Sequence, residues 1–147
     1  MHLPDTALSR AQDPFLLFAR VLIALLFLPE GWAKIVDFQN TVGYIESSHM
    51  PMPQVAAIAA IGAELGLGLL LLVGWQARWA ALGLVVYVAV LTPVFHDFWN
   101  LDGGRRALQH AMFFKNLAII GGLLAFAACG PGRYSFDARL SPRPSPG

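Results

Sequence analysis

The sequence predicts an all-α membrane protein, folded as an up-down bundle of four spanning helices. Of its 147 residues, 56% are hydrophobic and 13% are charged, and the mean hydropathy is +0.58. This composition is too apolar for the surface of an ordinary soluble domain. A helix needs about 20 residues to cross a hydrocarbon core of about 30 Å. The chain contains four apolar runs of about that length, at residues 15–36, 54–73, 79–95 and 110–129.

The charge balance and the cysteine count exclude several classes of protein. Ten Lys and Arg residues nearly cancel nine Asp and Glu residues, so the chain has no basic surface to bind nucleic acid. Cys129 is the only cysteine, which rules out an internal disulfide, a redox-active cysteine pair and a Cys-rich zinc or iron–sulfur site. The lipid bilayer is therefore the main expected partner.

The first predicted span, residues 15–36, contains a proline and three charged side chains. Pro29 removes a backbone donor and clashes with the carbonyl four residues earlier, so we expect a kink just before Glu30. An arginine inside the apolar run and the lack of a small-residue cleavage site indicate a retained span and not a signal peptide. We interpret that arginine, Arg20, as an anchor at the inner interface. Glu30 and Lys34, four residues apart, form a favourable pair on one helix face.

Polar and helix-breaking segments separate the four runs. Residues 37–53 are polar and end in Met50-Pro51-Met52-Pro53, which predicts an interfacial loop. Residues 74–78 form a tight turn, and residues 96–109 form the next polar loop. Gly130-Pro131-Gly132 ends the fourth span. The predicted parts are an N-terminal segment at 1–14, a transmembrane domain at 15–129 and a cytoplasmic tail at 130–147, disordered at its end.

The positions of Lys and Arg predict the orientation, because short cytoplasmic loops are enriched in these residues. The end of the bundle that holds both termini and the turn at residues 74–78 carries Arg10, Arg20, Arg78, Arg133, Arg139 and Arg143. The opposite end carries Lys34, Arg105, Arg106 and Lys115. We therefore expect a multi-pass protein of the bacterial inner membrane with both termini in the cytoplasm.

Up-down topology places several polar side chains in one layer near the outer face. Glu30 and Lys34 lie near the outer end of the first span, and His96 follows the third. His110 and Lys115 begin the fourth span, about 140° apart around the helix, so they cannot face one cavity. We expect Lys115 to snorkel or to pair with an acid on a neighbouring helix.

Glu64 lies about ten residues, or roughly 15 Å, inside the second span, near the midplane. A charge at that depth costs about 2.5–3.5 kcal/mol, so we expect Glu64 to face the bundle interior. Its two alternative states are a neutral proton carrier, which we prefer, and half of an ion pair with Lys34 or Lys115. Small residues on its helix face let another helix approach closely; they are Ala57, Ala60 and Gly68.

Structural interpretations of the same residues stay open. Glu30 and Lys34 could form only a stabilising ion pair, and His96 and His110 could be hydrogen-bonding residues at headgroup level. Two His and two Glu could ligate a metal, but the Glu-x-x-His spacing of such sites is missing. A haem between the two His is disfavoured because both lie at the membrane edge. We predict no metal, haem, flavin or iron–sulfur cofactor.

Short segments in all four spans carry a family resemblance. They are Leu26–Ile35, Ala63–Gly68 with Gly74 and Arg78, Phe95-His96, Phe113–Ala118, Gly121–Leu124 and Gly130-Pro131-Gly132. In order and spacing, over about residues 15–137, they resemble the DoxX family of small four-helix bacterial membrane proteins. The family name comes from a subunit of a quinol oxidase or thiosulfate:quinone oxidoreductase, and other members are linked to membrane-associated redox complexes. The resemblance implies a quinone-linked redox role.

The first hypothesis is therefore a redox subunit whose substrate is a quinone or quinol. Glu64 would carry protons, and an imidazole would exchange them with the outer side. The chain has no evident electron carrier, so a redox partner subunit or a bound substrate would supply the electrons. The candidate catalytic residues are Glu64, Glu30 and Lys34, and the candidate substrate-binding residues are His96, His110 and Asn116.

Two alternatives belong to other classes of protein. One is a non-catalytic binding or transport protein for a small lipophilic or anionic solute, which would use the same residues without redox chemistry. The other is a membrane anchor or assembly partner of a soluble enzyme. Association with further copies of the chain, as a homo-oligomer, is also left open.

Overall fold

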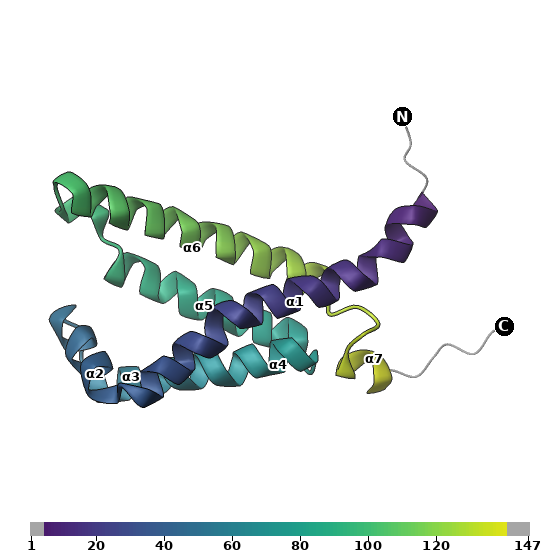
Figure 1. Cartoon of the computed structure of the whole chain (residues 1–147), viewed down its shortest axis with the longest axis horizontal. Coiled ribbons are helices and arrows are strands. Elements are labelled where there is room, and N and C mark those ends of the chain that lie inside the picture. The colour runs from purple at the N-terminus through teal and green to yellow at the C-terminus, as the bar shows by residue number, and fades with distance from the viewer. Residues whose placement is uncertain (1–4, 141–147) are drawn as a thin grey trace.

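Four long helical rods lie side by side in an elongated bundle (Figure 1). The structure is a computed structural model that describes residues 5–140. Each rod is long and apolar enough to cross a membrane, and the described residues contain no strand, which confirms the predicted fold class. The rods are α1 (Asp5–Val36), a second rod made of α3 (Pro53–Ile61), η1 (Gly62–Leu67) and α4 (Gly68–Val73), α5 (Ala77–Phe95) and α6 (Gly103–Cys129).

The core of the bundle forms where α5 lies between the second rod and α6. The buried face of α5 begins with small residues, so the first turns of this helix can approach its neighbours closely. Ala77, Ala81 and Leu84 on this face are fully buried. They pack with Leu71 of α4 and Leu123 of α6 in one cluster. This core leaves the other end of the bundle less tightly filled, and the cavity described below lies there.

The second rod approaches α1 through two glycines. A side chain at Gly31 of α1 would place a Cβ only 2.8 Å from Leu65 Cγ and 3.0 Å from Glu64 Cβ. A Cβ at Gly68 would lie 3.0 Å from Leu28 of α1. The middle of this rod, η1, is a π-helical turn, a rare form that is often found at functional sites. The expected stripe beside Glu64 is buried, as predicted: Ala57, Ala60, Glu64 and Gly68.

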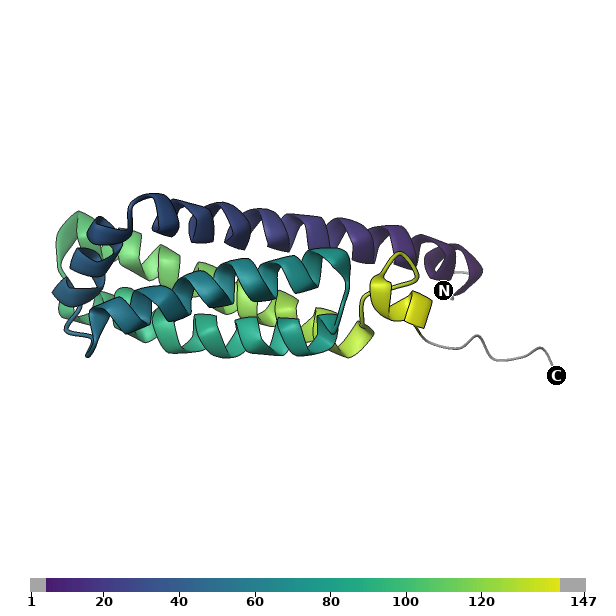
Figure 2. The ribbon, with the colours of Figure 1, turned by 90° about the horizontal axis from the view of Figure 1, so that it is seen from below.

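The prediction of an interfacial loop at residues 37–53 is wrong for most of these residues. Residues Phe38–Ser47 form helix α2, which lies across one end of the bundle (Figure 2). Phe38, Val42 and Ile45 follow a spacing of four and three, which creates an apolar stripe. Val42 and Ile45 are buried against Ala57 of α3, with Phe38 packed beside them. The many polar residues of this segment occupy the remaining face. The overall composition of the segment is therefore polar and does not indicate the apolar stripe.

Two helices also begin earlier than predicted. Helix α6 begins at Gly103, so the loop predicted at 96–109 shrinks to a short connection that contains the 3-10 turn η2 (Phe98–Asn100). After two glycines at its start, the added turns of α6 contain Arg, Ala, Leu and Gln, which favour helix. Helix α1 begins at Asp5, inside the predicted N-terminal segment, and continues through Pro29; the expected kink stays a prediction.

The tail predicted at 130–147 is partly folded, and its expected disordered end lies outside the described residues. Helix α7 (Phe136–Leu140) returns to the turn between α4 and α5. Asp137 accepts hydrogen bonds from the backbone N–H groups of Gln76 and Ala77, at 2.8 and 3.0 Å. These donors belong to the first turn of α5, which has no helical partners for them. We call this end of the bundle the α7 end and the opposite one the α2 end.

Arg20 is not an interface anchor. It is 1% exposed, and its Nη2 donates a hydrogen bond to the backbone oxygen of Tyr134 at 2.5 Å. Gly74 makes room for it, since a Cβ at this position would collide with the guanidinium. Gly74 also has φ of 73°, a left-handed conformation that favours glycine. Arg20 therefore ties α1 to the returning C-terminal segment.

Candidate functional site

A cavity of about 520 Å³ lies toward the α2 end, between α1, α2, the second rod, α5 and α6. This volume is in the range of small-molecule binding sites. Most of its wall is apolar, with Phe27, Ile45 and Leu91 among its residues. The polar side chains in the wall come from five helical elements and from His96, which follows α5: Glu30, Lys34, Thr41, Tyr44, Glu64, Tyr87, His96, Lys115 and Asn116.

One wall of the cavity carries a connected group of three side chains, which we call the Lys34–Glu64–Tyr87 group. Lys34 Nζ lies 2.9 Å from Glu64 Oε2, and Tyr87 Oη donates a hydrogen bond to Glu64 Oε1 at 2.6 Å. The Glu64 side chain is 8% exposed and the Lys34 side chain 24%. The geometry is that of an ion pair, the alternative to a neutral carboxyl for Glu64. A role for Glu64 in proton transfer stays a prediction.

The predicted pair of Glu30 and Lys34 is present but secondary. Lys34 Nζ lies 3.7 Å from Glu30 Oε2, and the Glu30 side chain is 67% exposed. Lys34 is therefore closer to the buried carboxylate of Glu64 than to the exposed one on its own helix. Exposed pairs of this kind contribute little to stability, about 0–1 kcal/mol.

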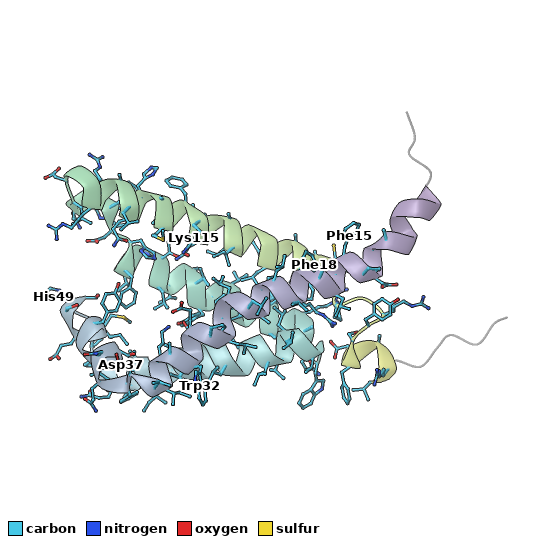
Figure 3. The ribbon with its side chains drawn as sticks, viewed as in Figure 1. Phe15, Phe18, Trp32, Asp37, His49 and Lys115 are labelled. Carbon is cyan, nitrogen blue, oxygen red and sulfur yellow. The ribbon has the colours of Figure 1, made fainter. Side chains whose placement is uncertain are left out.

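The opposite wall carries a second polar group from α5 and α6. Asn116 Nδ2 donates a hydrogen bond to Thr92 Oγ1 at 3.1 Å, and Thr92 Oγ1 donates to the backbone oxygen of Val88 at 2.6 Å. Asn116 thus faces the cavity with its amide held by a buried hydroxyl. Lys115, the preceding residue, also lines the cavity, and Figure 3 shows it on the edge of α6 that faces α5.

The two candidate histidines lie in different surroundings. His96 lines the cavity, and its Nδ1 lies 2.6 Å from Gln109 Oε1. His110 is not among the residues that line the cavity, and its role in substrate binding stays a prediction. Its ring packs between Phe98 and Phe114, with ring centroids 4.8 and 4.6 Å away. The reason is helix phase, because Lys115 and His110 lie on different faces of α6.

Sequence reasoning missed Tyr87 and Thr92. Both are polar groups inside an apolar span, where such residues commonly face the interior of a bundle. Tyr87 lies eight positions before Phe95, the end of α5, or about 12 Å. That depth is close to the depth of Glu64 in the second rod. A comparison of depths along the two spans could have placed the phenol beside the carboxylate.

The fold and the cavity define a class of protein: a small four-helix membrane protein with a partly polar cavity between its helices. The chain belongs to the DoxX family, whose family model matches residues 15–97. The matched segment contains Lys34, Glu64 and Tyr87 and ends before Lys115 and Asn116.

Curated relatives cover nearly the whole chain. Inner membrane protein YqjF of Escherichia coli is 35% identical over 134 residues, which are 91% of this chain and 98% of that protein. Inner membrane protein YphA of the same organism is 33% identical over 129 residues, which are 88% and 92% of the two chains. An uncharacterized membrane protein of Mycobacterium tuberculosis is 28% identical over 88% of this chain and 83% of its own length. No solved structure matches the chain with significance.

Proposed function

We propose that this protein is an inner-membrane component of a redox complex and binds a quinone or quinol in the cavity of about 520 Å³. The observation that carries the proposal is the Lys34–Glu64–Tyr87 group, which lies in the wall of an otherwise apolar cavity. A quinone head is a flat apolar ring with carbonyl oxygens that need donors. The cavity supplies apolar walls for the ring and polar hydrogens for those oxygens.

Reduction of a quinone to a quinol consumes two electrons and two protons. In this proposal a partner subunit of the complex, a reductase, supplies the electrons, and this chain supplies binding and protons. Lys34 and Tyr87 both carry polar hydrogens, and Glu64 bridges them. As Tyr87 gives a proton to the substrate oxygen, Glu64 passes Tyr87 a proton taken from Lys34, and Lys34 is reprotonated from water. Two such rounds supply the two protons. His96, in the wall toward the α2 end, is the candidate for exchange with water.

The proposed location is the bacterial inner membrane, with both termini in the cytoplasm. Two relatives are named inner membrane proteins of Escherichia coli, which supports this location. Exposed tryptophans occur at both ends of the bundle, as is typical of the two membrane interfaces. They are Trp75 and Trp79 toward the α7 end and Trp32 and Trp99 toward the α2 end.

The test measures binding of a short-chain ubiquinone to the detergent-purified protein. Quenching of tryptophan fluorescence is the signal that reports binding. We expect saturable binding by the wild type. Tyr87→Phe and Glu64→Gln should weaken it about three- to tenfold, since each removes a polar contact of the cavity wall. Tyr134→Phe, which alters an exposed phenol outside the cavity, is the matched control and should bind as the wild type does. No saturable binding, or equal binding by all four proteins, would contradict the proposal.

A further inference from the structure

The cavity has a second cation, and it lies on the wall opposite the Lys34–Glu64–Tyr87 group. Lys115 of α6 lines the cavity, and the contact found for its ammonium is with the thioether of Met112, at 3.3 Å. A thioether is a weak acceptor. Among the side chains that the structure describes, no carboxylate lies within 4.0 Å of Lys115. The acid partner expected for Lys115 on a neighbouring helix is therefore not found.

The carboxylates of the cavity are already engaged. Glu30 and Glu64, the acids of the cavity wall, both lie within 4.0 Å of Lys34. Glu64 also accepts the hydrogen bond from Tyr87. On this side of the cavity two carboxylates thus share one ammonium, whereas no carboxylate of the described residues pairs with the ammonium on α6.

The depth of Lys115 makes an unmatched charge costly. It lies 12 residues after Gly103 and 14 before Cys129, about 18 and 21 Å from the two ends of α6. These distances place its backbone near the middle of a helix that is long enough to cross the bilayer. Cations at such depths usually pair or face a polar cavity. Asn116, which donates to Thr92, is a further polar residue of the cavity wall on α6.

We propose that the ligand of this cavity is an anionic quinone, one with an ionised hydroxyl or carboxylate substituent, and that Lys115 is the counter-ion of this substituent. The inference rests on the proposed quinone function and specifies its substrate class. The two poles of the cavity then have different tasks. The Lys34–Glu64–Tyr87 group faces a carbonyl oxygen, and Lys115 with Asn116 holds the negative charge.

A pair of naphthoquinones of nearly equal size tests the inference. 1,4-Naphthoquinone is neutral, whereas 2-hydroxy-1,4-naphthoquinone is a vinylogous acid that is ionised at neutral pH. We expect the anion to bind the purified wild-type protein about tenfold more tightly than the neutral compound, because a charge-assisted contact replaces a solvated ammonium. Lys115→Met should remove this preference, and Lys115→Arg should retain it.

Matched controls separate the possible failures. Arg106→Met removes a cation from the exposed first turns of the same helix, outside the cavity, and should keep the preference for the anion. Equal affinities of the wild type for both compounds, or a preference that survives in Lys115→Met, would overturn the inference and leave quinone binding intact. Failure of both compounds and of the short-chain ubiquinone to bind would overturn the proposed function itself. Thermal unfolding of each variant in detergent verifies that its fold is retained.

Discussion

Lys34 of α1 and Glu64 of η1 form an ion pair at 2.9 Å, and Lys34 lies about one turn along α1 from Gly31, a close approach of the two helices. That approach occurs at Gly31, where the missing side chain leaves room for Leu65 and for the Cβ of Glu64. The small residue and the charge pair are thus parts of one arrangement. Their separate replacement gives the first two predictions.

Glu64→Gln should destabilise the protein by about 2–3 kcal/mol. Removal of one partner from a fully buried ion pair costs about 3–5 kcal/mol, and the cost is lower here because Lys34 is partly exposed. The glutamine oxygen can still accept from Tyr87, but Lys34 loses its negative partner. The measurement is thermal or chemical unfolding in detergent. Lys34→Met should cost less in the Glu64→Gln background than in the wild type, which isolates the pair. A Glu64→Gln variant as stable as the wild type would show that the pair contributes nothing.

Gly31→Ala should destabilise the protein by about 1–3 kcal/mol, the usual cost of overpacking. Its Cβ would lie 2.8 Å from Leu65 Cγ and 3.0 Å from Glu64 Cβ, so α1 and η1 must separate. The control is Gly121→Ala in α6, where a Cβ would meet nothing within 4 Å. The control should be neutral or slightly stabilising, because alanine favours helix over glycine. Equal effects at the two positions would contradict the close approach.

Asp137→Ala should destabilise the α7 end by about 0.5–2 kcal/mol, the typical range for loss of a helix cap. The carboxylate accepts from the N–H groups of Gln76 and Ala77 at the start of α5. Asp102 is a suitable control, since it directly precedes α6, as Gln76 precedes α5, but makes no capping hydrogen bond with its side chain. Hydrogen exchange of the first turn of α5 should increase in Asp137→Ala and stay unchanged in Asp102→Ala. The reverse pattern would refute the assigned cap.

Cys129 provides a test of the proposed orientation. It is exposed and lies at the end of α6, toward the α7 end. With both termini in the cytoplasm, a thiol reagent that cannot cross membranes should label Cys129 only after the cells are permeabilised. Rapid labelling in intact cells would place the α7 end outside. Cys129→Ser serves as the unlabelled control.

Helix phase predicted which faces are buried but not which partners meet. The burial of Glu64 with Ala57, Ala60 and Gly68 follows from their spacing along one helix. The choice of Lys34 over Lys115 as the partner of Glu64 depends on how α1 crosses the second rod. That crossing is set by tertiary contacts at Gly31, which no local pattern specifies.

The errors have local physical causes as well. Helix α2 was missed because a weak stripe of Phe38, Val42 and Ile45 is outnumbered by polar neighbours. The role of Arg20 was missed because its acceptor, the backbone of Tyr134, lies 114 residues away in sequence. A π-helical turn such as η1 is a rare form, and no pattern in residues 62–67 predicts it.

The return of the C-terminal segment to the turn between α4 and α5 sets the shortest chain that can fold as described. A fragment that stops at Cys129 would keep all four rods. In that fragment the guanidinium of Arg20 would lose its hydrogen-bond acceptor, the backbone carbonyl of Tyr134. Two backbone N–H groups at the start of α5 would lose the carboxylate of Asp137. Engineered variants should therefore retain residues through Leu140, and fusions belong beyond that residue.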